Sequence, residues 1–389
     1  MSSNIQGQSI IDHFDNMIDH CYDFAEAAKS RGRPVVGIMC EFTPRELILA
    51  AGGIPVCLCG GSADTIPDAE RTLPANLCPL IKSTYGYHVK EANPFLKWAD
   101  LIVAETTCDG KKKMFELLAA SKPMHVLELP QKSNDEDGLT HWIGEVQKLK
   151  DRLEKQFSTI ITDSALRSAI DLMNCERVFR RKLAGWMKQE LPPLTGRQLL
   201  NFKSIISCME MDLQQYEKAL ELFEQGGSLP GSAKATGKRN VRVLLTGVPT
   251  AHGAGSERII HLIENAGATI VCSENCTGLK PILEDVNVGI RDPLKAIATK
   301  YYHLPCSVMT ANNDRFTSLR NLAAEYKPDC VLELVWQACL TYDIESIRVR
   351  SFVENELHLP YLKITTDYSP SDSARITARI EAMMEMVQH

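Results

Sequence analysis

The sequence predicts an α/β protein with two parallel-sheet units and a helical segment between them. Short apolar strands alternate with amphipathic helices in residues 34–130, and the same alternation returns in residues 241–368. Residues from about 139 to 223 show helical periodicity with many charges instead. A chain of 389 residues is long enough for two domains, each with its own core.

In the first unit, buried strands are expected where β-branched and other apolar residues cluster. A helix is expected over 43–52, with Thr43 as its cap and Pro44 in its first turn. A second helix is expected from Lys111 onward, directly after the stretch that ends at Cys108. The expected strands are 34–40, 54–60, 101–108 and 123–130.

The second unit repeats this architecture without a visible tandem repeat of the sequence. Helices are expected in SERIIHLIENAG and IESIRVRSFVENEL, and strands at 241–249, 268–274, 329–336 and 359–368. A stretch rich in Gly, Ser, Ala and Lys, EQGGSLPGSAKATGKRN, has the composition of a linker. The predicted division is therefore 1–138, 139–223 (helical), 224–240 (linker) and 241–389.

Composition narrows the class of partner. The net charge is -6 and the pI is near 6.0, so the chain offers no broad basic surface for nucleic acid or anionic membrane. No apolar run approaches a membrane span, and the N-terminus lacks the pattern of a secretion signal. We therefore expect a cytoplasmic protein that acts on a small molecule or on another protein.

Thirteen cysteines are unusual for such a chain, and their predicted positions divide them. Reduced cysteine is often a buried core residue. We predict this role for the cysteines inside helices (Cys21, Cys175, Cys208) and inside strands (Cys57, Cys272, Cys330). The other seven follow strands or lie in loops near helix starts: Cys40, Cys59, Cys78, Cys108, Cys276, Cys306 and Cys339.

Strand ends are where open α/β sheets gather their ligands. Cys78 precedes a proline that suits a first helical turn, and Cys108 also precedes a helix, so free amides would stabilise both thiolates. No CxxC pair is present, and Cys57 and Cys59 would point to opposite faces of a strand. Spacing alone leaves three readings open, namely an iron–sulfur site, a zinc site and unrelated core thiols.

Two glycine-containing stretches could be mistaken for nucleotide loops. GSAKATGKR departs from a phosphate loop in spacing and lacks the following Ser or Thr, whereas TGVPTAHGAGSER departs from GxGxxG. We expect no nucleotide site in either. Lys111, Lys112 and Lys113 are expected on a solvated helix face, with charge compensation near thiolates as the alternative.

Several long motifs in order resemble the 2-hydroxyacyl-CoA dehydratase and benzoyl-CoA reductase component family, most closely its double-cubane cluster protein branch. The resemblance runs from about Val35 to Asp372. It rests on CEFTPRELILAAGGIPV, NLCPLIKSTYGYH, ETTCDGKKKMFELL, ENCTGLK, WQACLTYDIES and ITTDYSPSD.

The resemblance implies two Rossmann-like domains with an iron–sulfur cluster between them. Dehydratase subunits of the family hold one 4Fe-4S cubane through three cysteines and pair with a related chain. The double-cubane branch holds an 8Fe-9S unit through six cysteines in each chain of a homodimer. The ligands expected on this basis are Cys59, Cys78, Cys108, Cys276, Cys306 and Cys339, with Cys40 as a possible substitute for Cys59.

The function that the resemblance implies is low-potential reduction of a small unsaturated substrate. A separate ATP-hydrolysing iron–sulfur activator would supply the electrons. One alternative is an (R)-2-hydroxyacyl-CoA dehydratase subunit with a single 4Fe-4S cluster, and another is a non-enzymatic electron carrier. Lys82, Tyr87, Glu105 and His252 lie near the expected cluster loops, and each is more often a structural hydrogen-bonding residue than a catalyst.

Overall fold

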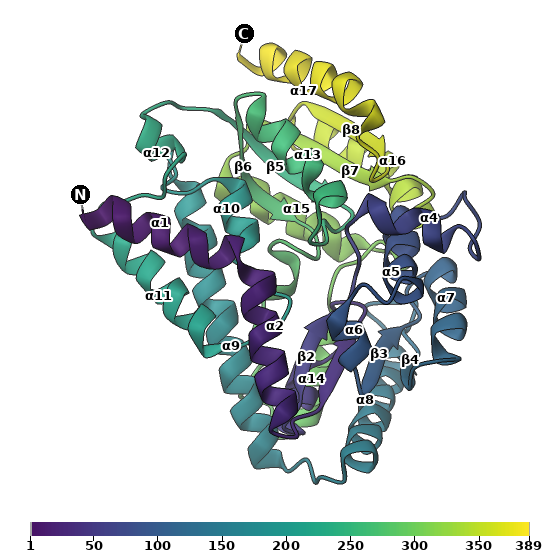
Figure 1. The fold of residues 1–389 in the computed structure, drawn as a ribbon. Coiled ribbons are helices and arrows are strands. Elements are labelled where there is room, and N and C mark those ends of the chain that lie inside the picture. The colour runs from purple at the N-terminus through teal and green to yellow at the C-terminus, as the bar shows by residue number, and fades with distance from the viewer. Residues whose placement is uncertain (1, 389) are drawn as a thin grey trace.

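The computed structural model describes residues 2–388 and contains two four-stranded parallel sheets. The first has the order β2-β1-β3-β4 and the second the order β6-β5-β7-β8, so the two halves share one topology (Figure 1). The predicted fold class is confirmed. The strands are β1 Val35–Ile38, β2 Ile54–Cys57, β3 Leu101–Glu105, β4 Met124–Leu127, β5 Val241–Gly247, β6 Ala268–Glu274, β7 Cys330–Trp336 and β8 Tyr361–Thr366.

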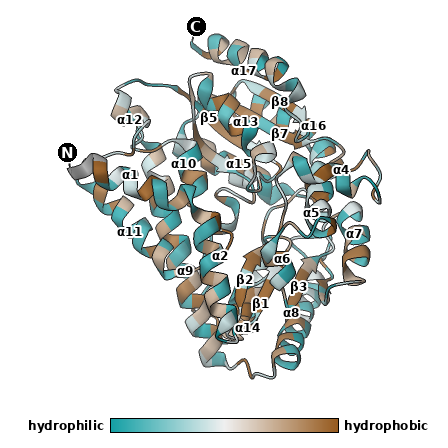
Figure 2. Ribbon diagram, in the orientation of Figure 1, coloured by the Kyte–Doolittle hydropathy of each residue, from teal (hydrophilic) through white to brown (hydrophobic). Residues whose placement is uncertain are grey.

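The inner strands are mostly apolar because helices cover both faces of each sheet, and their buried polar exceptions are Glu105, Arg242, Thr246 and Glu333. Every residue of β1, β3, β5 and β7 is buried, whereas the edge strands β4 and β8 are partly exposed. Figure 2 shows the resulting brown strands beneath mixed helices. Continuous apolar runs of this kind are typical of parallel sheets with both faces covered.

Helices follow the strands of the first sheet as α3 Arg45–Ala50, α4 Ile66–Ala69, α5 Pro79–Val89, α6 Pro94–Trp98 and α7 Asp109–Ala119. The expected cap of α3 is wrong by one residue. Pro44 occupies the N-cap, and the buried Thr43 hydroxyl instead donates a hydrogen bond to the Glu105 carboxylate at the end of β3. The polar side chain is therefore used to connect two strand ends rather than to cap a helix.

The charged middle of the chain is helical, as predicted. It contains α8 Glu136–Phe157, α9 Asp163–Gly185, α10 Gly196–Asn201 and α11 Glu210–Glu224, while the N-terminus adds α1 Ser2–Asp15 and α2 Met17–Ser30. Side-chain caps from Asp135, Thr162 and Thr195 begin α8, α9 and α10. Within residues 2–388, even the longest helices are too polar to span a bilayer.

The second sheet is covered by α13 Ala254–Asn265, α15 Asn313–Tyr326, α16 Leu340–Asn355 and α17 Ser373–Gln388. Helix α14, Pro293–Tyr302, packs instead against α8 and α9 and joins the core of the first sheet. Four short 3-10 turns (63–65, 186–188, 280–282, 370–372) complete the chain together with α12, Ala233–Thr236. The GSAKATGKR stretch thus forms this short helix, begun by the Ser232 side chain.

Two glycine-containing loops join the two halves. The Gly61 carbonyl accepts a hydrogen bond from the Ser256 amide in the first turn of α13, at 3.0 Å. A Cβ atom at Gly61 would lie 2.3 Å from the His252 carbonyl oxygen, so this approach requires glycine. The TGVPTAHGAGSER stretch therefore docks one half on the other, and an amide that could have bound an anion is already occupied.

Glu264, near the end of α13, holds the first turn of α10. Its carboxylate accepts hydrogen bonds from the amides of Gly196 at 2.8 Å and Arg197 at 3.4 Å. Burial nevertheless raises the pKa of Glu264 from 4.5 to about 7. In that pH interval the native state binds more protons than the unfolded state.

We therefore expect stability to fall as pH rises from about 4.5 to about 7, with Glu264 contributing on the order of 2 kcal/mol. E264Q keeps a hydrogen-bond acceptor for Gly196 and should flatten this part of the curve. Urea unfolding at several pH values measures the difference, and the exposed E381Q serves as the control. Parallel curves for E264Q and wild type would contradict the assignment.

Candidate iron–sulfur site

Three helices begin at cysteines. Cys78, Cys108 and Cys339 are the N-cap residues of α5, α7 and α16. Proline at the first position of α5 explains why that helix starts at Cys78. In each case the free amides of the first helical turn lie beside the sulfur, an arrangement that favours thiolate.

These three sulfurs form one group, which we call the helix-cap thiols. The Cys339 thiol is close enough to hydrogen-bond the Cys78 sulfur, which lowers the pKa of Cys78 and raises that of Cys339. Cys108 lies near both of them, and burial raises the pKa of its thiol. Two cysteines from the first sheet's loops thus meet one from the second.

Cys40, Cys276 and Cys306 form a second group, which we call the loop thiols. They follow β1, β6 and α14 respectively, and Cys40 lies near the other two. Burial raises the pKa of Cys40, and it raises that of Cys276 to about 12. Cys59 differs, because its thiol donates a hydrogen bond to the Met39 carbonyl oxygen at 3.3 Å.

A cleft with about 680 Å³ of empty space adjoins the loop thiols. Cys57 and Cys59 both line it, so the expectation that they point apart is wrong. The reason is that side chains alternate along an extended chain, so residues two positions apart, such as Cys57 and Cys59, lie on the same face. The lining also includes Cys40, Glu41, Lys111, Lys203, His252 and Cys276.

Three lysines lie against the thiols. Lys111 is not on a solvated face: its Nζ donates to the Met39 carbonyl at 2.7 Å, beside Cys40 and Cys59. Burial opposes its charge, yet these thiols raise its pKa above the usual value. Lys112 and Lys113 are exposed, as expected, and pair with Asp109 and Glu116.

Lys203 and Lys280, the other two lysines that lie against the thiols, are close to Cys276. Lys203 Nζ contacts the Glu41 carboxylate at 2.5 Å and donates to the Cys276 carbonyl at 2.7 Å. Lys280 is buried and lies 3.1 Å from the Glu274 carboxylate. The positive charges close to the two thiol groups therefore fit a strongly anionic occupant.

Tyr342, on α16, lies near the loop thiols Cys276 and Cys306. It lies one turn after Cys339, and its ring is 5.9 Å from Lys280 Nζ and 5.1 Å from the Arg315 guanidinium. Its hydroxyl is buried without a hydrogen-bond partner in the region of Cys276 and Cys306. An orphaned donor of this kind has a natural partner if an acceptor occupies the site.

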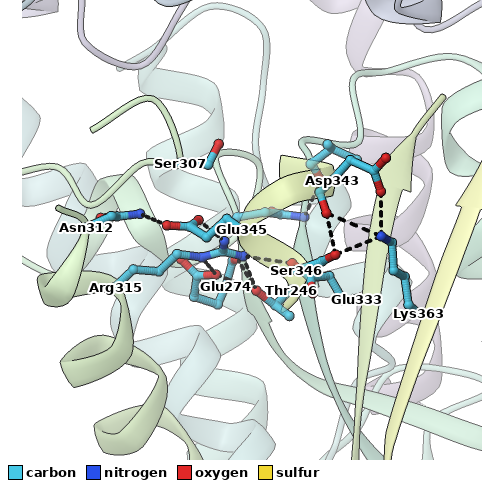
Figure 3. A network of polar contacts seen from close by, with 12 residues as sticks. Thr246, Glu274, Ser307, Asn312, Arg315, Glu333, Asp343, Glu345, Ser346 and Lys363 are labelled. Atoms are coloured by element: carbon cyan, nitrogen blue, oxygen red, sulfur yellow. Dashed lines mark hydrogen bonds and ion pairs between the residues drawn. The ribbon is translucent and has the colours of Figure 1, made fainter. Parts of the chain in front are cut away.

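A buried charge network fixes α16 behind these groups (Figure 3). Arg315, on α15, is fully buried and pairs with Glu274 on β6, Glu333 on β7 and Glu345 on α16. Its Nη2 also donates to the Thr246 hydroxyl at 2.9 Å. The guanidinium, carried by α15, thereby connects α16 to the three strands β5, β6 and β7.

The exposed edge of the network holds the first turns of α16. Lys363, on β8, pairs with Asp343 and donates to the Ser346 hydroxyl at 2.7 Å. Ser307, next to Cys306, donates to Thr341 at 3.3 Å. The loop of Cys306 and the helix of Cys339 are therefore tied to each other.

The spacing of the sulfurs bears on the zinc alternative that the sequence left open. Among the described residues, no three cysteine sulfurs lie within 4.8 Å of one another. A tetrahedral zinc site with Zn–S bonds of about 2.3 Å would place its sulfurs about 3.8 Å apart. Thiolates that bind different irons of a cluster are spaced more widely. The lack of a compact trio thus argues against a closed zinc site with three or more thiolates, while Cys78 and Cys339 lie at hydrogen-bond distance.

Sequence reasoning missed several residues of this site. Lys280 follows Cys276 by four positions and Tyr342 follows Cys339 by three, so local spacing could have suggested both. The sequence did not indicate Lys203, because this residue comes from the loop after α10, far along the chain from Cys276. Among the polar residues singled out, His252 and Glu105 adjoin the cleft and its thiols, whereas Lys82 pairs with Glu70.

The chain is similar in sequence to several known proteins. The chain is 38 % identical over 370 residues to YjiM of Escherichia coli (strain K12), which carries the name of a dehydratase subunit; the match covers 92 % of this chain and 93 % of YjiM. The (R)-phenyllactyl-CoA dehydratase beta subunit of Clostridium sporogenes is 22 % identical, with 91 % and 92 % covered. One benzoyl-CoA reductase subunit, from Thauera aromatica, is 26 % identical, with 73 % and 72 % covered.

The family model described as 2-hydroxyglutaryl-CoA dehydratase, D-component, matches residues 40–387. The match begins at Cys40 and includes all of the helix-cap and loop thiols. The chain therefore belongs to the 2-hydroxyglutaryl-CoA dehydratase D-component family.

Proposed function

We propose that this chain is an iron–sulfur reductase component with a double-cubane 8Fe-9S cluster. In this proposal it receives low-potential electrons from a separate ATP-hydrolysing activator and reduces a small unsaturated substrate. The observation that carries the proposal is the second thiol group. One 4Fe-4S cubane needs no more than the helix-cap thiols, yet Cys40, Cys276 and Cys306 gather beside them.

The ligands we assign are Cys78, Cys108 and Cys339 for one cubane and Cys276, Cys306 and Cys40 for the other. Cys40 takes the place of Cys59, because Cys59 donates its thiol hydrogen to the Met39 carbonyl and lies near Cys57. Cys40 lies with Cys276 and Cys306 instead. When bound, such a cluster supplies electrons at low potential.

The chain's own residues would tune and protect this chemistry. Lys111, Lys203 and Lys280 offset negative charge near the thiols, and the Tyr342 hydroxyl can donate to an acceptor there. Glu105 is buried, with one carboxylate oxygen unpartnered, and burial raises its pKa to about 7. It can therefore hold a proton close to the cleft at neutral pH.

The second candidate is a dehydratase subunit that uses one 4Fe-4S cluster and an acyl-CoA substrate. The names of the relatives favour it, since two of the three described above are dehydratase subunits by name. A third candidate is an electron carrier without catalysis. For the reductase we also propose the homodimeric state of the double-cubane branch.

Acyl-CoA binding separates the first two candidates. Titrating the anaerobically purified protein with an (R)-2-hydroxyacyl-CoA, followed by calorimetry, should give no measurable binding if the chain is a small-molecule reductase. Binding in the micromolar range would instead support the dehydratase subunit. Repeated turnover of a small unsaturated substrate by the reduced protein would contradict the carrier.

A further inference from the structure

Helix α16 carries an exposed apolar stripe that nothing in the fold covers. Leu340, Ile344 and Ile347 are 68 %, 68 % and 73 % exposed and lie on one face, at positions i, i+4 and i+7. The opposite face of the helix is buried and includes Tyr342 and Val349. The stripe is therefore not part of the core.

This concentration is particular to α16 within the described side chains. The other large exposed apolar residues occur singly, one in each helix, strand or loop that has any. Scattered single residues need no explanation, whereas a contiguous stripe indicates an interaction surface.

The position of the stripe indicates what binds there. Leu340 directly follows Cys339, one of the helix-cap thiols, so a protein seated on the stripe lies next to that group. Electron transfer slows steeply with distance, and this is where a donor would have to dock. The Arg315 network fixes α16 from behind, so the stripe is a rigid platform.

The size of the stripe argues against a permanent partner. Three aliphatic side chains offer far less than the about 800 Å² that each partner buries in a stable complex, while transient redox encounters use smaller areas. A second copy of this chain held permanently would need more apolar surface than α16 presents.

We propose that Leu340, Ile344 and Ile347 form the docking surface for a separate electron-donating iron–sulfur protein that binds transiently over Cys339. This inference rests on the proposed function, because it requires a cluster at the helix-cap thiols. It adds the surface through which the electrons enter.

The test uses the double variant I344Q/I347Q, which leaves Leu340 beside Cys339 unchanged. The exposed pair Ile160 and Val288, at 79 % and 63 % exposure, gives the matched control I160Q/V288Q. The probe is the reduced activator of a 2-hydroxyacyl-CoA dehydratase with Mg-ATP, and bleaching of the visible absorption reports the rate of reduction. Titanium(III) citrate, a small reductant that needs no docking surface, reports whether the site itself is intact.

I344Q/I347Q should be reduced at least tenfold more slowly by the activator, and at the wild-type rate by titanium(III) citrate. Its iron content and the behaviour of I160Q/V288Q should match wild type. Equal rates of reduction by the activator for the variant and wild type would overturn the docking proposal. So would an activator that reduces neither protein while titanium(III) citrate reduces both. Either result would leave the proposed function standing.

Light scattering tests whether a second copy of this chain binds the stripe instead, because it measures the molar mass in solution. A wild-type dimer that I344Q/I347Q converts to monomer would show that the stripe binds a second copy, and the docking proposal would be wrong. A wild-type chain without iron would instead overturn the proposed function itself.

Discussion

Replacing Cys339 with serine is expected to remove about half of the iron of the anaerobically purified protein, and replacing Cys276 with serine should do the same. Each substitution breaks one of the two thiol groups and leaves the other with its three sulfurs. Iron analysis per chain, with visible and electron paramagnetic resonance spectra, measures the loss.

The matched control for these substitutions is C175S, because Cys175 is exposed on α9, away from both groups. It should retain all of its iron. If C276S and C40S also keep the wild-type iron content, the loop thiols hold no cluster, and the helix-cap thiols alone define the site. The response of C59S decides between Cys40 and Cys59, since we expect it to keep its iron.

Replacing Arg315 with methionine is expected to destabilise the protein by about 3–5 kcal/mol, because buried carboxylates then lose their cation. Arg315 is fully buried and pairs with Glu274, Glu333 and Glu345. Burial already raises the pKa of Glu333, and loss of the guanidinium removes what opposes that rise. Urea unfolding of the apo and iron-loaded protein measures the change.

Arg320, on the same helix, provides the control. Its side chain is 51 % exposed and pairs with Glu356, which is 56 % exposed, so R320M should cost less than about 1 kcal/mol. Equal losses for R315M and R320M would mean that the buried network does not stabilise α16. R315M should also weaken iron retention at Cys339, since the network fixes that helix.

The sheets could be predicted from the sequence because their signal is local. The run PVVGIMC is apolar throughout, and its counterpart VRVLLTGVP is apolar except for Arg242 and Thr246, as is typical of strands covered on both faces. Cys78 could be placed at a helix start because Pro79 fits the first helical position. These features depend on a few neighbouring residues.

What could not be predicted depends on contacts between distant segments. Lys203 reaches the Cys276 carbonyl from the loop after α10, and α14 packs into the core of the first sheet. Thr43 has the sequence position of a cap, but Glu105, 62 residues later, takes its hydroxyl. In the sequence, Arg315 looks like an ordinary polar residue of an amphipathic helix. Its buried ion pairs become visible only in the fold, which brings the strands with its glutamate partners close to it.

The grouping of the cysteines shows the same limit. Position relative to strands separated the seven site cysteines from Cys21, Cys272 and Cys330, which the structure buries. It could not show that Cys40 lies with Cys276 and Cys306 while Cys59 bonds to Met39. Cys57 lines the cleft together with Cys59, as residues two positions apart in an extended chain do.

The measurement that tests the central claim most directly is the iron and acid-labile sulfide content per chain after strictly anaerobic purification. A double cubane held by the helix-cap and loop thiols predicts about eight irons with slightly more sulfide. About four irons with equal sulfide would contradict it and favour the dehydratase subunit with one cluster. Zinc in place of iron would contradict both.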